Sequence, residues 1–175
     1  LSGYRNEVKK LASNQFISNT YTRTEVGHPI SSFYGYVIDG IFQTQGEVDS
    51  HVEQSDKAIG RWKYRDVNYD GKIDSQDRAY IGNPHPDFEY SLSSRFYYKN
   101  FDLSLYIQGS QGNDICFASK GGRDGLDFWG DYFNKSTRIL NTWTPENRNA
   151  ELPEINILNP NDEAGKVSSY LIEDR

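Results

Sequence analysis

Apolar and polar side chains alternate with a period of two between residues 87 and 108, which is the pattern of β-strands with two different faces. The alternation breaks at Lys99-Asn100 and resumes at Phe101. We therefore predict two antiparallel strands joined by a tight hairpin. Each strand is about long enough to cross a bilayer when tilted, since a transmembrane strand needs roughly 9 to 11 residues.

The two faces of this hairpin tolerate different surroundings. Arg95 stands in the middle of the first strand, where a lipid-facing arginine would cost about 2–4 kcal/mol. In a transmembrane hairpin, Arg95 would therefore face a water-filled lumen. The candidates for the lumen-facing side are Glu89, Arg95, Asp102, Tyr106 and Gln108. A soluble β-sandwich hairpin with one solvated face is the commoner source of such alternation, and periodicity alone does not choose between the two.

Long stretches without clear periodicity flank the hairpin, from about residue 27 to 86 and from 109 to about 168. Compact soluble domains rarely carry such loops, whereas outer-membrane barrels combine short turns on one side with long loops on the other. We therefore expect both stretches to be irregular extracellular loops. The shorter predicted elements are a weak strand at 16–24, a helix at 128–143, an extended segment at 153–160 and the start of another strand at 170–172.

The composition is polar for a chain of 175 residues. Its mean hydropathy is -0.80 and its net charge is -6, with scattered Lys and Arg residues, so nucleic acid is not an expected partner. No apolar run approaches the roughly 20 residues of a membrane helix, and the first residues lack the layout of a signal peptide. The single Cys116 leaves no internal disulfide and no cysteine-based zinc site.

Residues 66–77 carry oxygen donors at the spacing of an EF-hand-like calcium loop. Gly71 stands at position 6, where such loops turn sharply, and Ile73 at position 8 is the apolar anchor. The predicted calcium ligands are the side chains of Asp66, Asn68, Asp70, Asp74 and Asp77 and the backbone carbonyl of Lys72. The closing Asp is shorter than the usual Glu, as in dockerin-type loops. An ordinary turn is the alternative, because Asp, Asn and Gly also stabilise turns.

Support for an enzyme is weak, and we expect a non-enzymatic protein. His28, His51 and His85 are isolated, and the chain has neither a Gly-x-Ser-x-Gly elbow nor a phosphate-binding Gly-Lys-Ser/Thr loop. Carboxylates gather only in residues 66–77. Acidic residues elsewhere, such as Asp124 and Asp127, are expected to be solvated.

A series of short motifs follows along almost the whole chain, from about residue 4 to residue 175. In chain order they are Gly27-His28-Pro29-Ile30, Phe33-Tyr34-Gly35-Tyr36, Asp39-Gly40-Ile41-Phe42-Gln43, residues 66–74, Asp77-Arg78, Ile81-Gly82-Asn83-Pro84, residues 98–104, Gln108-Gly109, Gly112-Asn113-Asp114 and residues 141–147. In this order they resemble the SusC/RagA-type TonB-dependent outer-membrane transporters. The chain departs from that family at Tyr69, where Gly is frequent, and at Arg61-Trp62, where a Pro-Gly-Asp turn is common.

The resemblance implies an all-β fold: a few antiparallel strands of a transmembrane β-barrel of about 22 strands, with long extracellular loops and one short helix in a loop. The chain would be a fragment from the C-terminal part of that barrel, without the N-terminal plug or the TonB box. Its expected segments are a strand or loop at 1–26, an extracellular loop at 27–86, a transmembrane hairpin at 87–108, an extracellular loop at 109–168 and the start of a further strand at 169–175.

The function implied by the resemblance is import of oligosaccharides or peptides across the outer membrane. The expected partners are a SusD-like surface lipoprotein, the TonB complex through the missing N-terminal region, a glycan or peptide substrate and outer-membrane lipid. The alternative is a soluble, secreted β-rich carbohydrate-binding module with a dockerin-like calcium loop. Such a module would stack glycans on Trp62, Trp129 or Trp143.

Overall fold

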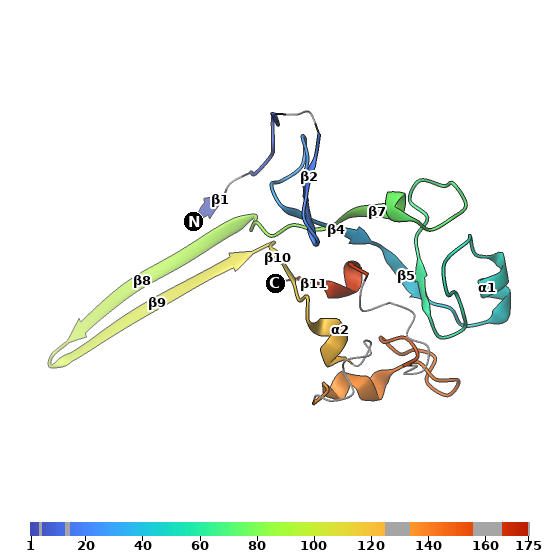
Figure 1. The fold of residues 1–175 in the computed structure, drawn as a ribbon. Helices are drawn as coiled ribbons and strands as arrows, with labels where there is room; N and C mark the ends of the chain where they lie inside the picture. The colour runs from blue at the N-terminus through green and yellow to red at the C-terminus, as the bar shows by residue number, and fades with distance from the viewer. Residues whose placement is uncertain (4, 13–14, 125–133, 156–165, 175) are drawn as a thin grey trace. The chain divides into compact units, whose positions relative to one another are not determined.

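The computed structural model describes residues 1–3, 5–12, 15–124, 134–155 and 166–174 (Figure 1). The chain forms two compact units. Unit 1 contains residues 1–33, 82–115 and 173–175, and unit 2 contains residues 34–81 and 116–172. Each unit is therefore built from segments that are far apart in the sequence.

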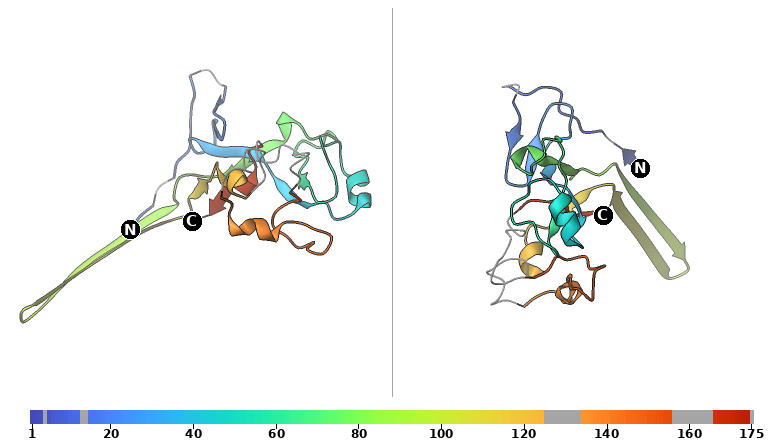
Figure 2. Two further views of the ribbon diagram at one scale, coloured as in Figure 1. Left: turned by 60° about the horizontal axis from the view of Figure 1, so that its bottom comes forward. Right: turned by 90° about the vertical axis from the view of Figure 1, so that its right-hand side faces the viewer.

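Unit 1 is built around the long hairpin (Figures 1 and 2). Strands β8 (Phe88–Tyr98) and β9 (Phe101–Gln111) pair antiparallel along their full length, with Lys99 and Asn100 as the connecting loop. Lys99 has a φ of 55°, a left-handed conformation of the kind that two-residue hairpin loops need. Strand β1 (Ser2–Gly3) pairs antiparallel with the start of β8, so the sheet order is β1-β8-β9. The predicted hairpin is confirmed, and its second strand continues past residue 108.

A short hairpin occupies the region predicted as one strand at 16–24. Strands β2 (Ile17–Ser18) and β3 (Thr22–Thr24) pair antiparallel, so the single-strand prediction is wrong. The chain reverses because the Asn19 side chain accepts the Thr20 N–H at 3.0 Å and the Asn19 N–H donates to the Thr22 carbonyl at 2.8 Å. Such local hydrogen bonds favour a turn over a continuous strand. Strand β3 then pairs with the first two residues of β4 (Ser32–Tyr36).

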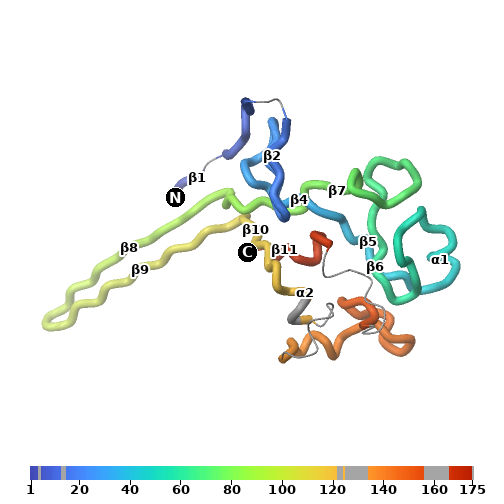
Figure 3. Tube along the Cα trace, viewed as in Figure 1, coloured from blue at the N-terminus to red at the C-terminus, as the bar shows by residue number. Residues whose placement is uncertain are grey.

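Unit 2 combines the two stretches that flank the hairpin (Figure 3). The first stretch supplies most of β4, then β5 (Ile38–Ile41), α1 (Gln45–Ser50), β6 (Trp62–Tyr64), the 3₁₀ turn η1 (Ser75–Asp77) and most of β7 (Arg78–Gly82). The second supplies α2 (Lys120–Arg123) and the 3₁₀ turns η3 (Thr137–Asn141) and η4 (Ser169–Leu171). Strands β10 (Asp114–Cys116) and β11 (Ile172–Asp174) form a two-stranded sheet. Both stretches, expected to be irregular loops, therefore contain short regular elements.

One hydrophobic core joins the two stretches of unit 2. Strand β5 pairs antiparallel with β6, whose Trp62 and Tyr64 are each 2% exposed. Tyr170, from the later stretch, packs on Trp62 with ring centroids 4.7 Å apart. The buried apolar side chains among the described residues all belong to this unit: Phe42, Val48, Trp62, Tyr64, Trp143, Leu152, Pro153, Val167 and Leu171. Burial of aromatic side chains on this scale is what stabilises a compact unit.

Gly60 marks a second place where the two stretches meet. Its carbonyl accepts the Glu154 N–H at 2.7 Å, and Trp143 Nε1 donates to Gln43 Oε1 at 2.9 Å. Gly60 has a φ of +83°, and a Cβ added there would lie 2.7 Å from the Trp143 ring. The close approach of the two stretches therefore requires a residue without a side chain at this position.

The predicted helix at 128–143 is not an α-helix in its described part. Residues 137–141 form the 3₁₀ turn η3, capped by the Ser136 hydroxyl, and Leu140 is 84% exposed. The apolar stripe is therefore not buried as a helical face. The first part of this prediction, at 128–133, and most of the extended segment at 153–160 lie outside the described residues. The strand expected from residue 170 begins at Ile172, directly after η4.

No helix among the described segments is both long and apolar enough to cross a membrane.

Replacement of Gly60 by Ala tests the packing between the two stretches. An alanine in the left-handed conformation should cost about 1–2 kcal/mol of stability, and its overpacking against Trp143 should cost about 1–3 kcal/mol more. Gly71→Ala is the matched control, because Gly71 has a φ of +87° but nothing within 4 Å of an added Cβ. Hydrogen exchange in the intact protein should be faster across residues 143–155 in Gly60→Ala only. Equal exchange in both variants would contradict this packing.

Candidate functional site

The pairing register of β8 and β9 separates their side chains into a polar face and an apolar face. Directly paired residues point to the same side of an antiparallel sheet, and Arg95 pairs with Ser104, Tyr97 with Asp102. The polar face comprises Glu89, Ser91, Ser93, Arg95, Tyr97, Asp102, Ser104, Tyr106, Gln108 and Ser110. All five residues predicted to face a lumen lie on it. On this face the Tyr106 hydroxyl donates to Gln108 Oε1 at 2.7 Å.

The opposite face of the hairpin is apolar and exposed. Its side chains are Phe88, Tyr90, Leu92, Ser94, Phe96, Tyr98, Phe101, Leu103, Leu105 and Ile107, with Gly109 opposite Tyr90. Leu92 is 56% exposed, Leu103 62% and Leu105 44%, which are values of surface residues and not of a core. An exposed apolar face of this extent marks a surface that contacts another apolar medium or another protein. Among the described residues, nothing seals these side chains as the interior of a soluble sandwich would.

Both long stretches leave the hairpin from the same end. Phe88, at the start of β8, pairs with Gln111 at the end of β9, and Gly3 of β1 also pairs with Phe88. The loop of Lys99 and Asn100 closes the other end. The hairpin therefore has one end with a minimal turn and one end from which the long connections depart.

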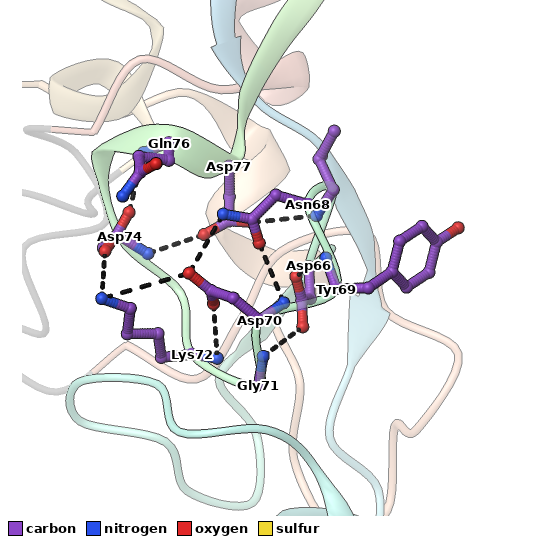
Figure 4. Close-up of polar contacts among 10 residues, drawn as sticks. Asp66, Asn68, Tyr69, Asp70, Gly71, Lys72, Asp74, Gln76 and Asp77 are labelled. Atoms are coloured by element: carbon purple, nitrogen blue, oxygen red, sulfur yellow. Dashed lines mark hydrogen bonds and ion pairs between the residues drawn. The ribbon is translucent and has the colours of Figure 1, made fainter.

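The acidic loop of residues 66–77, in unit 2, is held by hydrogen bonds that its backbone N–H groups donate to its own side chains (Figure 4). Asp66 Oδ1 accepts the Tyr69 N–H at 2.6 Å, and its Oδ2 accepts the Gly71 N–H at 3.0 Å. Asp77 is fully buried and accepts the N–H groups of Val67 at 2.9 Å and Asp74 at 2.8 Å. These bonds fix the course of the loop, as Asp and Asn side chains do in tight turns.

The ammonium group of Lys72 lies among the carboxylates of this loop. Its Nζ is 2.9 Å from Asp74 Oδ2 and 4.0 Å from Asp70 Oδ2. The hydrogen bond to Asp74 raises the pKa of Lys72. The pKa of Asp74 is lowered, first by the N–H of Gln76 and then by Lys72. Lys72 therefore supplies positive charge where the sequence predicts a cation.

The six predicted calcium ligands lie in one loop, but their side chains serve other partners in this arrangement. Asn68 Nδ2 donates to Asp70 Oδ2 at 3.0 Å, and the Lys72 N–H donates to Asp70 Oδ1 at 3.1 Å. Within the described parts of the chain, no three His, Cys, Asp or Glu side chains are grouped so that they could hold a metal ion. Calcium would require Lys72 to withdraw and the carboxylates to turn toward one point, so calcium binding stays a prediction.

Two of the three tryptophans of the alternative carbohydrate-binding module are buried and not available for stacking. Trp62 is 2% exposed and Trp143 6%, and both belong to the core of unit 2. Trp129 lies outside the described residues. A ring that stacks on a sugar must present a free face, which neither described tryptophan does.

The structural roles of Glu53 and Asp124 were not predicted from the sequence. Glu53 docks the acidic loop, because its N–H donates to the Gly71 carbonyl at 3.0 Å and its carbonyl accepts the Ile73 N–H at 2.7 Å. Asp124, expected to be solvated, is 2% exposed, accepts from the Tyr170 hydroxyl and lies 3.6 Å from Arg138. Asp127 lies outside the described residues. No local pattern signals these contacts, because their partners are distant in the sequence.

No family model matches the chain, but comparison with known proteins finds relatives. The chain is 31% identical over 148 residues to TonB-dependent receptor P26 of Formosa agariphila, and 30% identical over 143 residues to TonB-dependent receptor P3 of the same organism. These matches cover 82% and 81% of this chain but only 14% of each relative, so the chain spans a small part of their length.

A solved structure extends the comparison to the fold. The chain matches part of the RagAB peptide importer in its "closed-closed" state with a TM-score of 0.63 and 18% identity. The match covers 96% of this chain and 18% of that chain. The fold is therefore that of a partial antiparallel transmembrane β-barrel, as the sequence predicts.

Proposed function

The chain belongs to the TonB-dependent receptors and lies in the outer membrane, and from this premise we propose that it forms part of an outer-membrane importer. The single observation that carries the proposal is the division of the β8–β9 hairpin into an exposed apolar face and a polar face. A strand pair of this kind fits a barrel wall, with lipid on one side and a water-filled lumen on the other.

The proposed cargo is an oligosaccharide or a peptide, and the proposed partners are a SusD-like surface lipoprotein and the TonB complex. Support comes from the ordered motifs that resemble the SusC/RagA type and from the likeness of the fold to part of a peptide importer. On the polar face, Glu89, Arg95, Asp102, Tyr106 and Gln108 would border the path of the cargo. Hydroxyl, amide and charged groups there would replace part of the hydration of a polar solute.

The barrel assignment predicts opposite effects for arginine on two adjacent residues in the middle of β9. Leu105 lies on the apolar face, opposite Ser94, and Tyr106 lies on the polar face, opposite Ser93. Leu105→Arg should destabilise the membrane-inserted barrel by about 2–4 kcal/mol, whereas Tyr106→Arg should leave assembly intact. The measurement is the amount of folded, heat-modifiable receptor in outer membranes, made on the full-length protein.

Substrate uptake by the same cells then tests the transport role. Tyr106→Arg, which assembles, should change the rate of uptake of the oligosaccharide or peptide that co-purifies with the wild-type receptor. Equal assembly of the two variants would contradict the barrel wall. Normal assembly with unchanged uptake in variants of all five polar-face residues would contradict their place beside the cargo.

We further propose that the acidic loop binds calcium with low affinity. Support comes from the oxygen donors at positions 1, 3, 5, 9 and 12 and from the left-handed Gly71 at position 6. The ammonium of Lys72 competes for Asp74, and only the backbone carbonyl of Lys72 is a proposed ligand.

Removal of the competing ammonium should therefore strengthen calcium binding. In calorimetric titrations of the full-length receptor, Lys72→Ala should bind calcium more tightly than the wild type, because alanine keeps the backbone carbonyl. Asp66→Ala should lose the corresponding heat, because it removes the ligand at position 1. Titrations that do not differ among the three proteins would show that the loop is an ordinary turn.

A further inference from the structure

His51 is the only histidine of unit 2, and its backbone connects helix α1 to the segment that follows it. The chain has three histidines, and the other two, His28 and His85, belong to unit 1. The His51 N–H donates to the Glu47 carbonyl at 3.0 Å, where α1 ends. The His51 carbonyl accepts the Lys57 ammonium at 2.8 Å.

The segment after His51 holds two further parts of unit 2 in place. Glu53 exchanges two backbone hydrogen bonds with the acidic loop. The buried Gln54 bridges to β6, because its Nε2 donates to the Trp62 carbonyl at 2.8 Å and its Oε1 accepts the Tyr64 N–H at 3.0 Å. A change at His51 therefore acts where α1, the acidic loop and β6 are joined.

The imidazole of His51 lies in surroundings that suit its neutral form. Its ring centroid is 5.1 Å from that of Phe42, which is 0% exposed, so the ring borders the core. Its Nε2 atom is buried and, among the described residues, has no hydrogen-bond partner. A neutral imidazole carries an N–H on one nitrogen only, whereas the imidazolium carries one on both. Protonation would therefore bury a charged donor without an acceptor.

The charged groups that act on the ring also oppose its protonation. They are the ammonium groups of Lys57, in the segment after His51, and of Lys63 on β6. The carboxylate of Glu47 on α1 lies 4.0 Å from Lys63 Nζ. A cation at the C-terminal end of a helix is normally favoured. Here Lys57 already occupies that end, since its Nζ donates to the carbonyls of His51 and Val52.

The pKa of His51 is lowered in the folded protein. Burial is the largest cause of the shift below the ordinary pKa of 6.5, and Lys57 and Lys63 act in the same direction. The Gln54 side chain and the Tyr64 backbone act in the opposite direction without reversing the shift. Such a histidine contributes its full stability above the unfolded pKa, and this contribution is lost as the pH falls below about 6.5 toward the folded pKa.

We propose that His51 is a pH-sensitive switch that loosens helix α1 and residues 52–57 from the rest of unit 2 when the surroundings become mildly acidic. At neutral pH the ring packs on Phe42. Once charged, the imidazole leaves this buried position for water and takes the end of α1 with it. The inference goes beyond the proposed function and does not depend on its cargo or partners, because it concerns contacts within unit 2 only.

The test is hydrogen exchange of the full-length receptor at pH 7.5 and pH 5.5, with rates corrected for the pH dependence of intrinsic exchange. At pH 5.5 the wild type should exchange about threefold or more faster across residues 45–57, whereas the hairpin at residues 88–111 should keep its protection. Ordinary Asp and Glu side chains titrate below this window, and histidine titrates within it.

Two variants assign the response to one residue. His51→Phe keeps an aromatic ring beside Phe42 but cannot be charged, so its exchange across residues 45–57 should be equal at the two pH values. His28→Phe is the matched control, because His28 is a half-buried histidine of unit 1. It should respond to acid as the wild type does.

Unchanged protection of the wild type between the two pH values would overturn the inference. Slower exchange at pH 5.5 would also overturn it, because the end of α1 or the Phe42 ring would then stabilise the imidazolium. A response that persists in His51→Phe would assign it to another group, with the same consequence. None of these outcomes bears on the proposed function, which fails separately if Leu105→Arg and Tyr106→Arg assemble equally.

Discussion

The two faces of the β8–β9 hairpin require two different surroundings, and the function of the chain depends on this constraint. The register is continuous over both strands. The apolar face therefore carries only aliphatic and aromatic side chains, except at Ser94, Gly109 and Gln111. A slip of one residue would bring Arg95 to the apolar side. Water satisfies the polar face and lipid satisfies the apolar face, so a barrel wall accounts for both.

The long connections on either side of the hairpin are ordered by contacts with each other. The stretches before and after the hairpin are not separate flexible loops, because Tyr170 packs on Trp62 and the Glu154 N–H bonds to the Gly60 carbonyl. They form one unit with its own aromatic core. A compact unit can hold the acidic loop in a defined conformation, which a flexible connection could not do.

The hairpin can be predicted from sequence because its information is local: the alternation, its interruption at Lys99-Asn100 and the position of Arg95 lie within one short segment. The acidic loop is also visible from its spacing, but the placement of Lys72 between Asp70 and Asp74 is not. The core of unit 2 cannot be predicted from periodicity, because Trp62 and Tyr170 are more than a hundred residues apart. The reversal at Asn19 depends on two hydrogen bonds. The β-propensity of the residues does not reveal them and favours a continuous strand there.

The central claim is that one face of the hairpin meets lipid and the other meets water. The most direct measurement places single cysteines along residues 88–98 and 101–111 of the full-length receptor in membranes and labels each with a polarity-sensitive fluorophore. Nitroxide lipids should quench labels on the apolar face, an aqueous quencher should reach those on the polar face, and the two should alternate with a period of two. Quenching by the aqueous reagent on both faces, with no lipid effect at Leu92, Leu103 or Leu105, would contradict the account.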